Sequence, residues 1–266
     1  MKKIVALIDF SASSINALAF AAELSKRSQA NLLVVNAFSD DENDAKSKVF
    51  SVEAELKKSF LEGVNYEVLS MKGSLISVVD EINSYEKPDL IVMGTKGVGG
   101  LKKILIGSNA IDVIAEIKTP TLVVPESARF DDFIRKGKNR IVLATDLELL
   151  DNEHCVDILK EIALFIDEPK VRVLSVRPPG TKLPELKKIE RSFLLSVFAP
   201  EIESKSVTVF GDHVLEGINY YLNKKDDCGL VAMIANDSGA FFEKHYTREM
   251  ASHAELPLLI LHDVKI

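Results

Sequence analysis

Lys3-Ile-Val-Ala-Leu-Ile-Asp9 and Arg140-Ile-Val-Leu-Ala-Thr-Asp146 share one pattern, an apolar run that ends on an aspartate, and they lie 137 positions apart. The run Pro120-Thr-Leu-Val-Val-Pro125 has a counterpart at the same separation in Pro257-Leu-Leu-Ile-Leu-His262. Self-similarity at about half the chain length indicates that one structural unit occurs twice. The sequence therefore predicts two similar domains in tandem.

A third pair of runs shows where the two copies differ in length. Leu90 to Met93 matches Leu230 to Met233, but at a separation of 140 positions. The second copy must therefore gain three residues early and lose three later. The loss falls on the counterpart of the segment between Met93 and Pro120, which carries most of the candidate site.

Short apolar runs alternate with helical patterns in both copies. Runs of β-branched and aliphatic residues predict strands, and apolar residues at intervals of three and four predict the buried faces of helices. The expected strands span 3–8, 32–37, 65–71, 90–93 and 121–124, then 141–145, 171–176, 206–210, 230–235 and 258–261. The expected helical faces consist of Ile15, Leu18 and Ala22; Val49, Val52, Leu56 and Phe60; Leu75, Val78, Val79 and Ile82; Cys155, Ile158, Ile162 and Phe165; and Leu186, Ile189, Phe193 and Val197.

Strict alternation of strands and helices predicts the α/β class. Right-handed crossovers between successive strands give a mostly parallel sheet with helices on both faces. We expect a Rossmann-like, five-stranded parallel sheet in each domain, with the strand order 3-2-1-4-5. The domains are expected to span residues 1–126 and 139–266, joined by a charged linker at 127–138.

Charge and composition narrow the classes of partner. The 266 residues carry a formal net charge of −7, whereas proteins that bind nucleic-acid backbones usually have a basic excess. No uncharged apolar run is long enough to cross a bilayer, the amino terminus has no signal-peptide core, and two cysteines do not suggest an oxidised scaffold. We expect a cytoplasmic protein with no nucleic-acid partner and no membrane partner.

The segment from Gly94 to Asn109 carries most of the chemical information. It reads Gly94-Thr-Lys-Gly97-Val-Gly99-Gly100-Leu-Lys-Lys-Ile-Leu-Ile-Gly107-Ser108-Asn109. Glycine permits close approach of the backbone, so successive N–H groups can face a polyphosphate, and a helix that begins after Ser108 would favour an anion at its N-terminus. The alternative interpretation is a flexible, glycine-rich surface loop.

The spacing excludes two other phosphate motifs. Gly99-Gly100 stands where a Walker A loop requires a glycine followed by lysine, and Lys102 stands where a dinucleotide-binding motif requires its third glycine. A kinase or dehydrogenase function is therefore disfavoured.

Gly94-x2-Gly97-x9-Gly107-Ser108 resembles the nucleotide signature G-x2-G-x9-G-(S/T) of the ATP-binding universal stress protein family. The run from Lys3 to Asp9, followed by Ser11, resembles the opening strand of that family. The resemblance spans the whole chain, with the second copy more diverged. It implies a tandem, UspA-like protein with two domains of the adenine nucleotide alpha hydrolase-like fold.

The resemblance also implies a ligand and a set of contacts. The ligand would be ATP, or ADP or AMP, with Mg²⁺ as an optional companion. The backbone near Asp9 and Val35 would surround the adenine and ribose, and the glycines with Ser108 would hold the phosphates. Ala110 replaces a hydroxyl that some members have. The candidate nucleotide-binding residues are Asp9, Ser11, Val35, Asn36, Met93, Gly94, Lys96, Gly97, Gly107, Ser108 and Asn109.

Other polar residues have simpler interpretations beside the functional ones. Asp9 could coordinate a nucleotide-bound Mg²⁺, but a strand-end aspartate before a helix is as readily a cap or a ribose contact. Lys96 could neutralise phosphate charge. The five histidines all lie in the second copy without the spacing of a metal motif, and the two cysteines are expected to be packing or surface residues. No catalytic constellation is legible.

The second copy of the glycine-rich segment has lost most of its glycines. Between Ile234 and Arg248 it keeps only Gly239, while Phe241 and Phe242 add bulk where a phosphate would lie. We expect the second half to be a degenerate structural copy. Asp146 is retained, so binding of a different ligand by this half stays an open alternative.

Three functions follow as hypotheses. The first is a nucleotide-dependent regulator that binds ATP in its N-terminal half and hydrolyses it slowly at most. The second is a nucleotide-independent interaction scaffold, and the third, an enzyme acting on a nucleotide or acyl phosphate, lacks a recognisable general base. The apolar final strands of the two halves, together with the family resemblance, predict an intramolecular pseudo-dimer, and a further homodimer is plausible.

Overall fold

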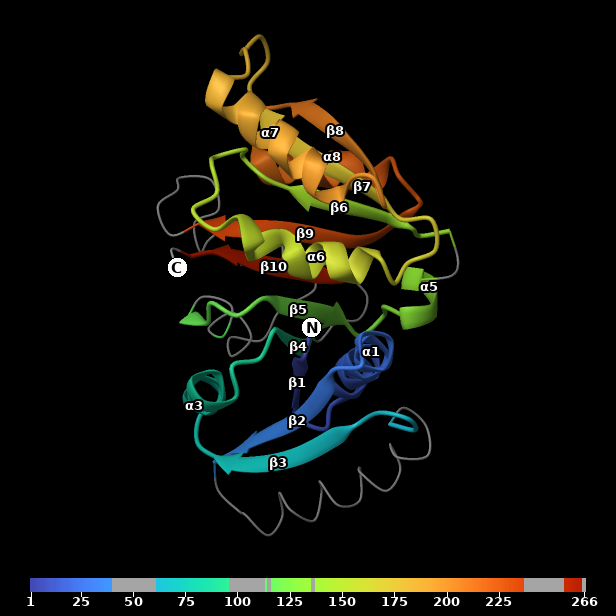
Figure 1. The fold of residues 1–266 in the computed structure, drawn as a ribbon, viewed down its shortest axis with the longest axis vertical. Coiled ribbons are helices and arrows are strands. Elements are labelled where there is room, and N and C mark those ends of the chain that lie inside the picture. Colours follow the sequence, from blue (N-terminus) through green and yellow to red (C-terminus); the bar gives the residue numbers. More distant parts are fainter. Residues whose placement is uncertain (40–60, 96–112, 114–115, 135–136, 237–255, 265–266) are drawn as a thin grey trace. The chain divides into compact units, whose positions relative to one another are not determined.

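The computed structural model describes residues 1–39, 61–95, 113, 116–134, 137–236 and 256–264 (Figure 1). The chain folds into two compact units, the first ending at Phe130 and the second beginning at Asp131. Each unit has its own parallel strands and its own helices.

The first unit contains five strands in the order β3-β2-β1-β4-β5, with every neighbouring pair parallel. The predicted order 3-2-1-4-5 is therefore confirmed here. The described elements are β1 (Lys3–Ile8), α1 (Ala12–Ser28), β2 (Asn31–Phe38), β3 (Tyr66–Lys72), α3 (Leu75–Glu86), β4 (Leu90–Thr95) and β5 (Thr121–Pro125).

The second unit repeats this topology as β10-β9-β6-β7-β8, again with parallel pairs. Its described elements are β6 (Arg140–Ala144), the 3₁₀ turn η1 (Glu153–Val156), α6 (Asp157–Ala163), β7 (Lys170–Arg177), α7 (Glu185–Phe198), β8 (Glu203–Phe210), α8 (Val214–Asn223), β9 (Cys228–Asn236) and β10 (Leu258–Asp263).

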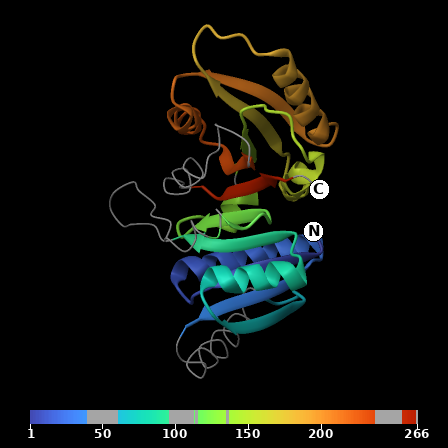
Figure 2. The same cartoon turned by 90° about the vertical axis from the view of Figure 1, so that its left-hand side faces the viewer.

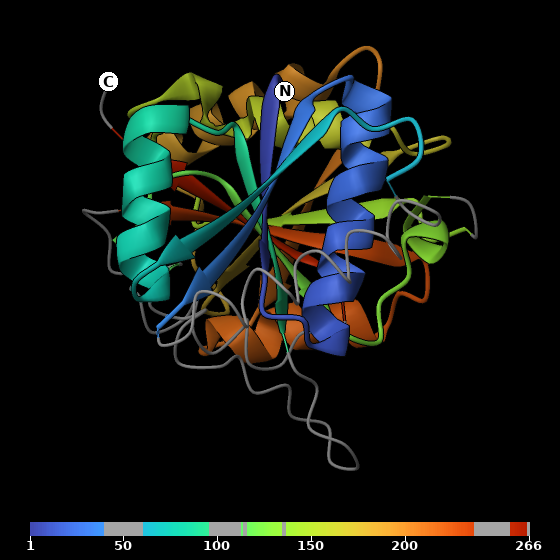
Figure 3. The same cartoon turned by 90° about the horizontal axis from the view of Figure 1, so that it is seen from below.

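Helices cover both faces of each sheet, as right-handed crossovers require. In the first unit α1 and α3 lie on opposite sides of the strands (Figure 3), and in the second unit α7 and α8 do the same (Figure 2). The central strands are deeply buried, with Ile4 and Ile141 both 0% exposed. A sheet covered on both faces explains why its central strands read as continuous apolar runs.

Local signals set the bounds of the helices in the first unit. The hydroxyls of Ser11 and Ser74 cap the first turns of α1 and α3 by accepting hydrogen bonds from backbone N–H groups. Gln29 ends α1 in the left-handed conformation, with φ of 57°. The helix expected over the apolar positions 49–60 lies outside the described residues.

Helix α7 exists where it was expected, but it buries a different face. Leu186 and Ile189 were predicted to face the core and are instead 60% and 59% exposed. The buried positions are Glu190, Leu194 and Phe198, which recur every four residues. The apolar residues of α7 cover a wide arc, and packing on the sheet buries only one side of that arc together with a glutamate.

The segment expected to be a linker contains a short helix, α5 (Phe130–Ile134). Phe130 is buried, and its ring packs edge-to-face on Phe20 of α1 with centroids 5.2 Å apart. The Asn16 side chain donates hydrogen bonds to the carbonyls of Pro125 and Ala128 at 3.0 and 2.9 Å. The beginning of this segment is therefore attached to α1.

Candidate functional site

The candidate site lies where β1, β2 and β4 end side by side. Strand β1 pairs with β2 on one side and with β4 on the other, so the direction of chain connection reverses at β1. Ligands of open α/β sheets bind at such a switch point, beyond the carboxyl ends of the strands. The structure brings six of the sequence-predicted residues to this edge: Asp9, Ser11, Val35, Asn36, Met93 and Gly94.

A tight turn joins β1 to α1. Phe10 adopts a positive φ of 63°, which is uncommon for a residue with a side chain. The exposed Asp9 accepts a hydrogen bond on Oδ1 from the Ser11 N–H at 3.0 Å, and the Ser11 hydroxyl donates to the same oxygen. Asp9 therefore holds the turn, which supports the capping interpretation of this residue.

A group of serines fixes the first turn of α1. The Ser11 hydroxyl accepts a hydrogen bond from the Ser14 N–H at 3.3 Å, and the Ser14 hydroxyl accepts one from the Asp9 N–H at 3.2 Å. Ser13 and Ser14 are only 3% and 5% exposed. Sequence reasoning named Ser11 alone, although serines, which are capping residues, stand at positions 11, 13 and 14.

Gly94 lies at the end of β4, directly against this first turn. A Cβ at Gly94 would stand 2.3 Å from the Ser13 carbonyl oxygen and 2.7 Å from the Ser14 nitrogen, closer than such atoms approach. Glycine is therefore required for α1 to begin beside β4. The resemblance assigns Gly94 to phosphate binding, and the structure adds a packing role that the sequence did not reveal.

The residues expected around the adenine and ribose could contact a ligand mainly through their backbone atoms. Val35 and Met93 are 1% and 4% exposed, so their side chains belong to the core. The Asn36 side chain, 5% exposed, donates a hydrogen bond from Nδ2 to the Ile8 carbonyl at 2.9 Å and so ties the end of β2 to the end of β1. These residues shape the edge of the sheet.

The remaining candidates of the glycine-rich segment lie outside the described residues. These are Lys96, Gly97, Gly107, Ser108 and Asn109. Their assignment to the phosphates stays a prediction.

The second unit has a different arrangement at the same edge. The strand registers place Ile234, only 4% exposed, at the position that Gly94 has in the first unit. Helical structure after β6 begins only at Glu153. Burial is the main cause that raises the pKa of Asp146 at this edge. The Phe241 and Phe242 part of the degenerate loop lies outside the described residues.

The cysteines of the second unit are packing residues. Cys155 and Cys228 are 7% and 2% exposed, and both are free thiols. Burial raises the pKa of each thiol to about 12, so neither is a reactive thiolate at neutral pH.

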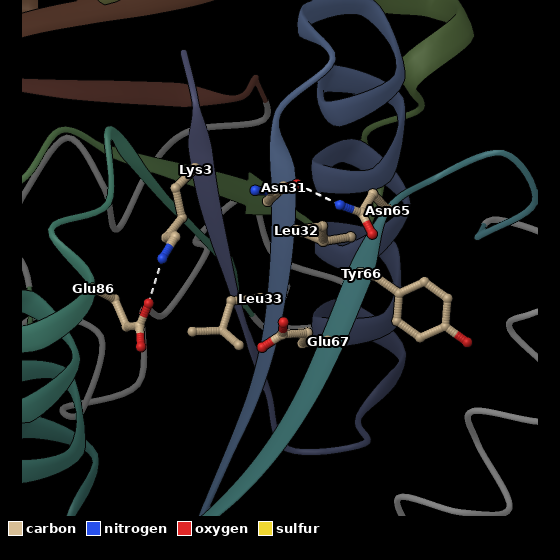
Figure 4. A pocket seen from close by; sticks show the side chains of 8 residues that line it. All are labelled: Lys3, Asn31, Leu32, Leu33, Asn65, Tyr66, Glu67 and Glu86. Atoms are coloured by element: carbon tan, nitrogen blue, oxygen red, sulfur yellow. Dashed lines mark hydrogen bonds and ion pairs between the residues drawn. The ribbon is translucent and has the colours of Figure 1, made fainter.

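A small pocket opens at the opposite, amino-terminal end of the first sheet (Figure 4). Its volume is about 90 Å³, and it is lined by the Lys3–Glu86 ion pair and by Asn31, which accepts a hydrogen bond from Asn65 at 2.6 Å. Ligand pockets usually enclose about 300 Å³ or more. This pocket is therefore too small for a nucleotide and lies away from the switch point.

The described residues include neither a candidate membrane helix nor a metal cluster. No helix in this part of the chain is long and apolar enough to span a membrane. Over the same residues, no group of three or more His, Cys, Asp or Glu side chains is arranged to hold a metal ion.

Comparison with known proteins agrees with the fold and with the opening strand. The model of the universal stress protein family matches residues 1–125. A universal stress protein of Methanocaldococcus jannaschii is 42% identical over 62 residues, which are 23% of this chain and 36% of that protein. One from Thermus aquaticus is 36% identical over 58 residues, 22% of this chain and 42% of that protein. The matches thus span less than half of these relatives.

A crystal structure of a universal stress protein from Archaeoglobus fulgidus superposes on the whole chain. The TM-score is 0.76, with 98% of each chain covered at 16% sequence identity. At this identity the likeness shows the fold alone, and it extends over both units. The family model matches residues 1–125, so it is this N-terminal half of the chain that belongs to the universal stress protein family.

Proposed function

We propose that the N-terminal half binds an adenine nucleotide, with ATP as the first candidate, at the carboxyl ends of β1, β2 and β4. Bound nucleotide would act as a regulator of the protein's stability and partner choice, with slow ATP hydrolysis at most. The observation that carries this proposal is the contact of Gly94 with Ser13 and Ser14, because it sets the N-terminus of a 17-residue helix beside the switch point.

Two further features support an anionic ligand at this edge. The first turn of α1 contains no acidic residue, so its N–H groups face no competing carboxylate within that turn. The glycine-rich segment from Gly97 to Ser108 begins two residues after β4 ends. Its spacing resembles a phosphate-binding signature of the universal stress protein family, whose model matches residues 1–125.

The remaining expectations are part of the same proposal. The domains would span residues 1–126 and 139–266 with a linker at 127–138, and the two halves would form an intramolecular pseudo-dimer that can pair further as a homodimer. Mg²⁺ would accompany ATP, and the protein would work in the cytoplasm.

Calorimetric titration of ATP, ADP and AMP with Mg²⁺ tests the proposal. We expect saturable binding of one nucleotide per chain to the wild type, and loss of binding in the Gly97→Asp, Gly107→Asp double variant, because the new carboxylates would repel phosphate. Gly239→Asp, placed in the degenerate loop of the second half, is the matched control and should bind like the wild type. Absence of binding by folded wild-type protein would refute the proposal.

One observation favours the interaction scaffold as a second candidate. Leu186 and Ile189 are exposed one turn apart on α7, and exposed apolar side chains in a group are typical of contact surfaces. The two candidates differ in the titration, since a scaffold would show no saturable nucleotide binding.

A further inference from the structure

The segment of residues 147–152, which we name the strap, joins β6 to η1 in the second unit and is held by carboxylates from distant parts of the chain. Asp263 at the end of β10 accepts hydrogen bonds from the Asp151 N–H at 2.9 Å and from the Asn152 N–H at 2.7 Å. Asp263 is only 4% exposed. One buried carboxylate therefore binds two successive backbone N–H groups of the strap.

A second buried carboxylate contacts the strap from α7. Glu190 is 4% exposed, and its Oε2 accepts a long hydrogen bond from the Leu150 N–H at 3.4 Å. Its Oε1 has no hydrogen-bond partner among the residues that the structure describes. A buried carboxylate with only one weak donor is poorly solvated when it is charged, so its neutral form is favoured.

The groups around Glu190 reinforce that preference. Asp146 precedes the strap, Glu153 lies in η1 and Asp263 lies on β10, and all three act on Glu190 as negative charges. The Cys155 thiol of η1, also near Glu190, stays neutral. Burial first, and then these three carboxylates, raise the pKa of Glu190 to about 7.

Lys187, three residues before Glu190 on α7, contacts the strap. Lys187 donates a hydrogen bond from Nζ to the Asp146 carbonyl at 2.9 Å and forms an ion pair with Glu148 at 2.6 Å. These contacts, together with those of Glu190 and Asp263, attach both ends and the middle of the strap to α7 and β10. A change of charge at Glu190 therefore acts on the contacts that attach the strap to α7 and β10.

We propose that the strap is a proton-controlled closure over the carboxyl end of β6, held down when Glu190 is neutral and loosened when Glu190 is ionised. When Glu190 ionises, its negative charge lies near that of Asp263 in a buried site, and the two carboxylates repel each other. Opening of the strap admits water and so weakens this repulsion. The strap occupies the position at which helix α1 begins in the first unit. The second half would therefore respond to protons at the edge where the first half is proposed to respond to nucleotide.

The direction of the pH effect follows from the two states of Glu190. The pKa is raised to about 7 in the closed state and returns toward the ordinary value of 4.5 when the strap opens. The closed state therefore binds the proton more tightly than the open state. The stabilisation of the closed state by this proton is complete below pH 4.5 and is lost as the pH rises to 7. The strap tightens on acidification.

Hydrogen–deuterium exchange of the Leu150, Asp151 and Asn152 amides at pH 5 and pH 7 tests the proposal. After correction for intrinsic exchange rates, the wild type should show protection that is higher at pH 5 by a factor on the order of 30, the value that the two pKa values imply. Glu190→Gln, which is neutral at both pH values, should show equal protection at pH 5 and pH 7.

Glu185→Gln is the matched control, because it removes the same charge from the same helix at a side chain that is 82% exposed. It should keep the pH dependence of the wild type. The same pH dependence in Glu190→Gln as in the wild type would overturn the proposal. A carbon-13 NMR titration of the wild-type Glu190 carboxyl decides the matter independently, since a pKa near 4.5 would also refute it.

Discussion

The turns after β1 and after β6 share two local features but lead to different structures. Phe10 and Leu147 have φ of 63° and 61°, and in each turn the preceding aspartate accepts a hydrogen bond from the N–H two residues later, at 3.0 Å for Asp9 and 3.1 Å for Asp146. The first turn leads directly into α1 at Ala12, whereas the second leads into the strap. The turn itself therefore does not decide whether a helix follows.

The neighbouring strand accounts for the difference. Gly94 leaves room for the first turn of α1, whereas its counterpart by strand register, Ile234, carries a buried side chain. A helix cannot begin against β9 as α1 begins against β4, and the second unit closes the same edge with carboxylates instead. The difference at this one strand position therefore accompanies a helix start in the first unit and a strap held by Asp263 and Glu190 in the second.

Gly94→Ala should have the largest effect, because it removes the feature that distinguishes the first unit from the second. The new Cβ would overlap backbone atoms of Ser13, which cannot move without displacing α1, so we expect a loss of about 3 kcal/mol in the free energy of unfolding. Urea denaturation measures the loss. Gly211→Ala is the matched control, because no described atom lies within 4 Å of a Cβ there, and it should change stability by less than about 0.5 kcal/mol. Equal effects at the two glycines would contradict the packing role of Gly94.

A second difference between the halves concerns helix packing. Gly217, the fourth residue of α8, faces Val176 on β7, whereas the fourth residue of α3 is Val78 and the strand position that matches Val176 is Ala37. A Cβ at Gly217 would stand 2.6 Å from a Val176 methyl group. We expect Gly217→Ala to lower the free energy of unfolding by about 2 kcal/mol.

Val176→Ala should relieve that overlap, so the Gly217→Ala, Val176→Ala double variant is expected to lose less stability than the two single losses combined. A coupling free energy of about 1 kcal/mol or more is the expected result of the double-mutant cycle. Additive losses of stability would show that the two positions are not energetically coupled.

The smallest expected effects are those of substitutions at Ser11 and Glu148, which each stand two residues after the aspartate of a turn. Ser11 caps α1, so Ser11→Ala should lower the free energy of unfolding by about 1 kcal/mol. Glu148 has no helix to cap and forms a half-exposed ion pair with Lys187, so Glu148→Ala should cost less than about 0.5 kcal/mol. Thermal or urea unfolding of both variants measures the difference, and an equal or larger loss at Glu148 would contradict it.

Much of the fold could be predicted because its signals are local or repeated. Buried parallel strands are continuous apolar runs, and the duplicated run ending at Asp9 and Asp146 identified the first strand of each unit. The start of β8 at Glu203 was missed, since this edge strand begins with charged residues at alternate positions. The candidate site was located by the same logic, because the ends of adjacent parallel strands meet at one edge.

From the sequence alone we could derive the α/β class, the strand order and the glycine spacing that resembles a nucleotide signature. Only the tertiary structure decided that Gly94 is a packing contact for α1, that α7 buries Glu190 in place of Ile189, and that Asp263 holds the strap 112 residues away. These features depend on which side chains meet across elements. Periodicity describes one element at a time, so it cannot show which part of an apolar arc is covered or which distant carboxylate reaches a backbone N–H group.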